Sequence, residues 1–159
     1  MSLYEDLSNI AAQKSLSFFE EKDSCTIFAR RVIDAYITHI EAPSSAVNFV
    51  TLDYNMSGTG EKLSPNSTPK LTQGADYHWY FGIGIKFQST SGSGIEETIV
   101  IGLMKQGAGF SAKLENNTSI NVTNEDTFNT LIAMIYALTE ENIKNIGRRS
   151  TSRIGFTRE

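Results

Sequence analysis

The sequence predicts an α+β fold with helices at both ends of the chain and an antiparallel sheet between them. Apolar residues recur at helical spacing near both ends and alternate with other residues in the middle. Helical and strand-like segments are segregated along the chain, which favours α+β over an alternating parallel sheet. The 159 residues fit one domain, expected at residues 1–147 and followed by a basic, mobile tail at 148–159.

The segment from Tyr77 to Gln106 predicts a long β-hairpin at the centre of the sheet. Two alternating apolar runs are joined there by small polar residues at 89–94. Successive residues of a strand point to opposite faces, so one set of side chains is assigned to the core. That set is Tyr77, Trp79, Phe81, Ile83, Ile85, Phe87, Ile95, Ile99, Ile101 and Leu103.

The opposite face of the hairpin, called the glycine face below, is the candidate binding surface. Glycine inside a strand marks a bend, a bulge or a close approach by other backbone. Strong curvature of the sheet fits this pattern, and so does a helix, a partner or a ligand lying flat on the glycines. The residues of the glycine face are His78, Tyr80, Gly82, Gly84, Lys86, Val100, Gly102 and Met104.

Residues 3–41 predict helix, with an apolar stripe at Leu3, Leu7, Ile10, Ala11, Phe18 and Phe19. The pattern either breaks near Lys22 or continues as one long helix. We expect two helices, because Asp23 and Ser24 can form a second N-cap. Pro43 ends the region, since the residue before a proline avoids the helical basin.

Shorter strands are expected on both sides of the hairpin, at residues 47–54, 110–115 and 119–122. They give a sheet of four or five strands in meander order. Residues 55–75 form a long polar excursion with glycines and prolines, in which regular structure is not expected. A mobile hairpin loop fits this segment, and so does a binding loop that orders on a partner.

A C-terminal helix is predicted to pack on the sheet through an apolar stripe. Thr123 or Asn124 can cap it, and the acidic residues that follow favour its positive end. A second capping signal at Thr139 allows a kink, and Gly147 is a natural terminator. The stripe consists of Phe128, Leu131, Ile132, Ile135 and Leu138.

No catalytic, cofactor or metal signature survives inspection of the sequence. Residues 107–112 match the spacing of a dinucleotide-binding motif, but a strand and not a helix follows. Asp76 and His78 could approach a metal, yet a catalytic zinc usually takes three protein ligands. The one cysteine, Cys25, is expected to be buried and inert. We therefore predict no catalytic residue, no cofactor and no metal.

The net charge and the absence of targeting signals limit the kinds of partner and the location that the sequence predicts. The formal net charge is −4, which weakens the case for nucleic-acid binding without excluding it. The start of the chain lacks the basic and apolar regions of a signal peptide, and no apolar run reaches the length of a membrane span. With a single cysteine, this predicts a cytoplasmic protein that does not contact membranes.

The leading hypothesis is a non-enzymatic binding or assembly protein, such as an inhibitor or accessory factor. It would use the glycine face to contact a protein, either another chain or a second copy in a homodimer. The first alternative is a nucleic-acid-binding protein that uses exposed aromatics and the tail arginines Arg148, Arg149, Arg153 and Arg158. The second alternative is a small-ligand binder or enzyme with a pocket between sheet and helices.

Overall fold

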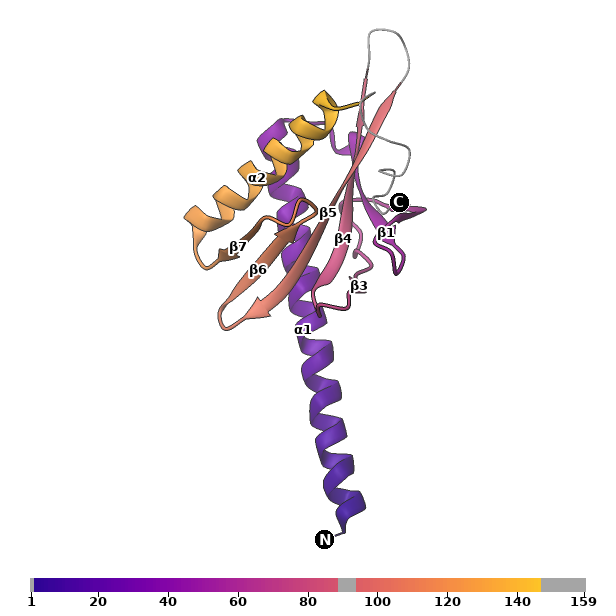
Figure 1. The fold of residues 1–159 in the computed structure, drawn as a ribbon, viewed down its shortest axis with the longest axis vertical. Coiled ribbons are helices and arrows are strands. Elements are labelled where there is room, and N and C mark those ends of the chain that lie inside the picture. The colour runs from indigo at the N-terminus through magenta and orange to yellow at the C-terminus, as the bar shows by residue number, and fades with distance from the viewer. Residues whose placement is uncertain (1, 89–93, 147–159) are drawn as a thin grey trace.

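The computed structural model describes residues 2–88 and 94–146 as an antiparallel sheet with two helices on one face (Figure 1). This confirms the α+β class and the helix packed on the sheet near the C-terminus. In chain order the elements are α1 (Leu3–Ile40), the short 3-10 helix η1 (Ser44–Ala46), β1 (Val47–Leu52), β2 (Gly58–Leu63), β3 (Thr72–Gln73), β4 (Trp79–Phe87), β5 (Ile95–Gln106), β6 (Gly109–Leu114), β7 (Ser119–Val122) and α2 (Glu125–Lys144).

The N-terminal region is one helix of 38 residues, so the prediction of two helices is wrong. The side chain of Ser2 caps its start by accepting a hydrogen bond from the Glu5 amide at 3.1 Å. No proline or glycine interrupts residues 3–40. The N-cap signal at Asp23 is a weak local preference, and it does not end a helix whose residues on both sides of Asp23 favour the helical conformation. Helix α1 ends at Glu41, whose backbone adopts the left-handed conformation just before Pro43.

Within the part of the chain that the structure describes, the sheet has seven strands and not four or five. Its order is β2-β1-β4-β5-β6-β7, and the short β3 pairs with β4. The predicted central hairpin is confirmed: β4 and β5 pair from Trp79 opposite Leu103 to Phe87 opposite Ile95. Strands β4 to β7 follow the predicted meander order. The expected connection of this hairpin falls mainly on residues 89–93, which lie outside the described residues.

The excursion at residues 55–75 supplies the two strands that the sequence did not predict. Strand β2 extends the sheet beyond β1, and β3 pairs with β4 at Tyr80 and Trp79. The hydroxyl of Thr72 also donates to the carbonyl of Leu52 at 2.9 Å. Strand β2 has an almost fully exposed, polar sequence. Backbone hydrogen bonds hold β2 against β1. The sequence of β2 therefore has no alternation of apolar residues from which a strand could be predicted.

The core lies between the two helices and the predicted face of the hairpin. Phe81, Ile83, Ile99, Ile101 and Leu103 are completely buried there. The assignment of Tyr77 to this face is wrong. Its backbone has a φ of +67° in the turn before β4, and its side chain is 70% exposed. The alternation therefore begins at the first residue of the strand and not before it.

Helix α2 runs through Thr139 without the break that the sequence allowed. Asn124 caps its start in a reciprocal capping box with Thr127. The hydroxyl of Thr139 donates to the carbonyl of Ile135 at 2.8 Å and lies 2.7 Å from the hydroxyl of Tyr36. Thr139 thus joins α2 to α1 inside the core and does not cap a new helix.

Candidate functional site

The N-terminal half of α1 extends away from the sheet and from α2 (Figure 1). Every residue from 3 to 20 is exposed. Contact with the sheet is established at Phe18, whose ring packs edge-on against Trp79 with centroids 5.1 Å apart. The large apolar side chains left exposed on this half are Leu3, Tyr4, Leu7, Ile10, Leu16, Phe18 and Phe19.

One apolar face runs along the whole of α1. Leu7, Phe18, Ala29 and Ile40 are spaced every eleven residues. An eleven-residue repeat corresponds to about 3.67 residues per turn, which nearly matches a straight α-helix. The stripe therefore stays on one side of α1. Ala29 is fully buried against the core, whereas Leu7 is 65% exposed. The face that packs on the sheet continues, uncovered, into the first half of the helix.

We call the uncovered part of this face the projecting stripe. Its members are Leu3, Leu7, Ile10 and Ala11, and Phe18 marks its boundary with the sheet. Lys14 lies within the stripe, one helical turn after Ile10. Residues 2–23 carry five acidic and two basic side chains, so the surroundings of the stripe are acidic.

The glycine face is covered largely by side chains of the same chain. Val100 is buried together with Val50 and Leu52 in a small second apolar cluster. A Cβ atom built on Gly84 would lie 2.8 Å from a methyl group of Val50, and one built on Gly82 would lie 3.1 Å from Val50. These two glycines make room for β1 side chains that lie across β4.

The third glycine of this face, Gly102, lies under the ring of Tyr80, which is its cross-strand partner. The hydroxyl of Tyr80 donates to Asp76 at 2.7 Å, and the Lys113 ammonium donates to the same carboxylate oxygen at 3.2 Å. Partial burial alone would raise the pKa of Asp76. The hydrogen bonds from Tyr80, from the His78 amide and from Lys113 outweigh it, and the pKa lies below its usual value.

Other residues of the glycine face are more accessible. His78 and Met104 are half-buried, and Lys86 is exposed. The structure therefore brings the predicted residues onto one sheet face, as expected from alternation. Whether that face also binds a partner stays a prediction. The tail arginines Arg148, Arg149, Arg153 and Arg158, together with the expected terminator Gly147, lie outside the described residues.

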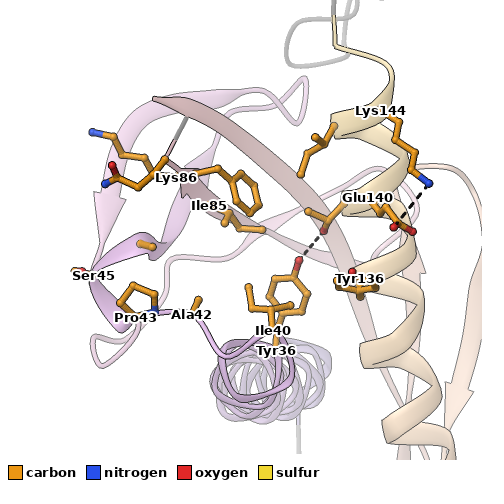
Figure 2. Close-up of a pocket in the computed structure, with 15 residues that line it drawn as sticks. Tyr36, Ile40, Ala42, Pro43, Ser45, Ile85, Lys86, Tyr136, Glu140 and Lys144 are labelled. Atoms are coloured by element: carbon orange, nitrogen blue, oxygen red, sulfur yellow. Dashed lines mark hydrogen bonds and ion pairs between the residues drawn. The ribbon is translucent and has the colours of Figure 1, made fainter. Parts of the chain in front are cut away.

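A pocket of about 660 Å³ opens between the C-terminal ends of α1 and α2 and strand β4 (Figure 2). Ile40, Ile85, Tyr136 and Ile143 give it a mainly apolar lining. The hydroxyl of Tyr36, hydrogen-bonded to Thr139, also reaches its wall. At the rim, the ammonium of Lys144 lies 3.7 Å from the Glu140 carboxylate.

Cys25 is completely buried, and its Sγ faces the carbonyl of Leu103 at 3.9 Å. Burial raises the pKa of the Cys25 thiol to about 12, and the nearby Glu21 adds to the effect. A thiol with such a pKa carries almost no thiolate near neutral pH, which does not suit a nucleophile.

Within residues 2–88 and 94–146, no three His, Cys, Asp or Glu side chains are grouped so that they could hold a metal ion. His78 contacts Asp76, at 3.3 Å from its carboxylate, while the ring of His39 packs against Tyr136. The two histidines therefore lie in different parts of the fold and contact different residues. Neither helix of the described chain combines the length and the apolar character needed to cross a membrane.

Comparison with protein-family models, with curated proteins and with solved structures found no match to this chain. Function must therefore be inferred from the geometry.

The apolar spacing of the first helix is visible in the sequence, but it did not predict a binding function for this segment. Apolar residues at helical spacing usually mark the core face of a helix. The length of the apolar pattern in the first helix was the signal that could have predicted an uncovered face. A stripe that runs for 38 residues in a domain of this size extends farther than one sheet can cover.

Proposed function

We propose that this protein is a non-enzymatic binding or assembly protein, and that the projecting stripe of α1 is its protein-docking element. One observation carries the proposal: the apolar face that forms the core contact of α1 continues uncovered for residues 3–17, over about 22 Å. Contiguous exposed apolar surface on a folded protein marks an interaction site.

The energetics support docking by this half of the helix. Most of the stability of a helix in a protein comes from packing of its apolar face, and residues 3–17 of α1 have no such packing. Fully burying one large apolar side chain contributes about 1.5–3 kcal/mol. A partner that covers Leu3, Leu7 and Ile10 would stabilise both the helix and the complex.

The charge of this segment favours a protein over nucleic acid or a membrane surface. Five acidic against two basic side chains repel phosphates and anionic lipid headgroups. Acidic side chains around an apolar stripe are, in contrast, compatible with a helix packed on another protein. The projecting stripe therefore fits the leading hypothesis better than the nucleic-acid alternative.

The test compares two double variants that add the same charge to opposite sides of α1. Leu7→Asp with Ile10→Asp places charge on the stripe, and Asn9→Asp with Ala12→Asp places it on the far side. All four positions are exposed, so at protein concentrations below the association range we expect both variants to fold with the Tm of the wild type. Sedimentation of the labelled chain, purified and in a lysate of its source cells, reports association.

We expect the wild type and the far-side variant to sediment in a complex, and the stripe variant to sediment as a monomer. Equal association of both variants would contradict the proposal. So would a wild-type chain that remains monomeric in both the purified and the lysate samples.

The pocket between α1, α2 and β4 supports a second candidate function, the binding of a small apolar ligand. Its volume of about 660 Å³ falls within the usual range of ligand sites, about 300–1,000 Å³. Because Tyr36 and Thr139 already hydrogen-bond each other, the wall favours an apolar chain over a polar group.

Thermal unfolding with decanol and with decanoate tests this candidate. A ligand bound only by the folded chain raises Tm by mass action. We expect both compounds to raise Tm in the wild type and to lose the effect in Ala46→Phe, which fills the pocket. An unchanged Tm with both compounds would remove this candidate.

A further inference from the structure

We propose that the occupant of the projecting stripe is a second copy of this chain, paired antiparallel so that the two helices cross at Ile10. This proposal rests on the docking function proposed above and names its partner. A twofold axis at the crossing makes each stripe cover the other, which is the commonest symmetry of a homodimer.

The charges around Ile10 match an antiparallel pair. Asp6 lies one helical turn before Ile10, and Lys14 lies one turn after it. With the crossing at Ile10, Lys14 of each copy lies opposite Asp6 of the other. The symmetry forms this opposite-charge contact twice, and it gives the lysine inside the apolar stripe a charged partner.

The same charges oppose a parallel pair in register. That arrangement would place Lys14 against Lys14 in the middle of the apolar contact. Like charges brought together at an interface are unfavourable, and removing them from water adds to the cost. The position of Lys14 therefore selects orientation as well as partner.

The length of the projecting half fits the antiparallel arrangement. Ile10 lies near the middle of the span from Leu3 to Phe18. When the helices cross there, Leu3 of the second copy reaches the level of Ser17, next to Phe18. Phe18 is 41% exposed where its ring meets Trp79. The second copy would cover it, and the two sheets would lie at opposite ends of the helix pair.

A charge-swap experiment tests the predicted contact. In sedimentation equilibrium, we expect Lys14→Asp alone and Asp6→Lys alone each to weaken the dimer at least tenfold. The double variant carries the same charges in exchanged positions, so we expect it to regain most of the wild-type affinity. Failure of the double variant to recover would overturn the predicted antiparallel contact.

A cross-linking experiment tests orientation directly. Chains with Asp6→Cys and chains with Lys14→Cys are treated with a short bismaleimide, separately and mixed. The antiparallel pair predicts a covalent dimer in the mixture and little in either sample alone. Covalent dimers within each separate sample would show the parallel arrangement and overturn the proposal. Cys25 is buried, so the wild-type chain serves as the unreactive control.

Different results would contradict the docking function of the projecting stripe and the pairing of two copies of this chain. A purified chain that stays monomeric at every concentration rules out the second copy as partner. If that chain still enters a complex in lysate, and Leu7→Asp with Ile10→Asp abolishes the complex, the docking function stands with another protein as partner. A monomer in both samples overturns both proposals.

Discussion

At the scale of single residues, the sheet is shaped by pairs in which one side chain occupies the space that a glycine leaves free. Tyr80 lies over Gly102, and Val50 lies over Gly84 and Gly82. The alternation of the sequence placed the glycines on one face but could not show what lay above them. Only the register of β1, β4 and β5 brings Val50 and Tyr80 to those positions.

The pair formed by Tyr80 and Gly102 leads to a packing prediction. A Cβ atom at residue 102 would lie 2.5 Å from the Tyr80 ring, so Gly102→Ala forces the ring to move. We expect this variant to lose about 1–3 kcal/mol of unfolding free energy in urea denaturation. In the Tyr80→Ala background the same change should cost much less. An equal loss in both backgrounds would show that the ring is not the cause.

Cys25 leads to a prediction about pH. Its folded-state pKa, about 12, exceeds the ordinary value of 9.0 because the thiol is buried. The folded chain therefore keeps a proton that the unfolded chain releases. The resulting stability is complete below about pH 9 and is lost at up to about 1.4 kcal/mol per pH unit as the pH rises toward 12.

Urea denaturation between pH 8 and 11 checks this effect. We expect the stability of the wild type to fall more steeply with pH than that of Cys25→Ala, which has no thiol to titrate. Parallel curves for the two proteins would contradict the assignment. A thiol reagent at pH 8 should also modify the native wild type only at the rate of unfolding.

At the scale of elements, α1 is one helix with two environments. Residues 21–40 include the side chains that pack on the sheet, and residues 3–20 are exposed. Local sequence signals could show that the segment is helical. They could not show that Asp23 and Ser24 lie inside the helix, because the same residue types also cap helices. Packing of Cys25 and Phe28 against the core decides between these roles.

This division predicts that the projecting half can be disrupted without unfolding the domain. Ser15→Pro removes a hydrogen bond and costs the local helix about 3 kcal/mol or more. We expect a loss of helical circular dichroism confined to the first turns, an unchanged Tm at protein concentrations below the dimerisation range, and a loss of association. Ser15→Ala should keep all three properties of the wild type. A large fall in the Tm of Ser15→Pro would show that this half contributes to the domain core.

At the scale of the whole molecule, the sheet and α2 cover one part of the α1 stripe and leave the rest in solvent. Ile33 and Ile10 provide a matched comparison on the same helix, because Ile33 is 0% exposed and Ile10 is 54% exposed. Ile33→Ala should cost about 2–5 kcal/mol of unfolding free energy. Ile10→Ala should cost less than about 0.5 kcal/mol in the monomer.

Urea denaturation at protein concentrations below the dimerisation range measures both values. At higher concentrations the apparent stability of the wild type should rise with concentration, because dimerisation stabilises the folded chain. Ile10→Ala should reduce this concentration dependence. Equal costs for the two alanine variants in the monomer would contradict the division of α1 into a packed and a projecting half.

Features that depend on local periodicity could be predicted from the amino-acid sequence alone. These are the helical ends of the chain, the hairpin of β4 and β5, the core side of that hairpin and the start of α2, which was expected at Thr123 or Asn124 and lies at Asn124. The apolar stripe of the first helix was also visible, since spacing alone defines it. Each of these features depends on a residue and its neighbours within a few positions in the sequence, so it can be inferred from the sequence alone.

Which surfaces are covered became visible only in the folded chain. The tertiary structure joined the two halves of α1, added β2 and β3 through backbone pairing, and placed Val50 and Tyr80 over the glycines. It also set the limit of the core at Phe18 and Trp79, which left the projecting stripe in solvent. Periodicity shows which side of a segment is apolar. Whether that side is buried depends on whether segments distant in the sequence extend far enough to cover it.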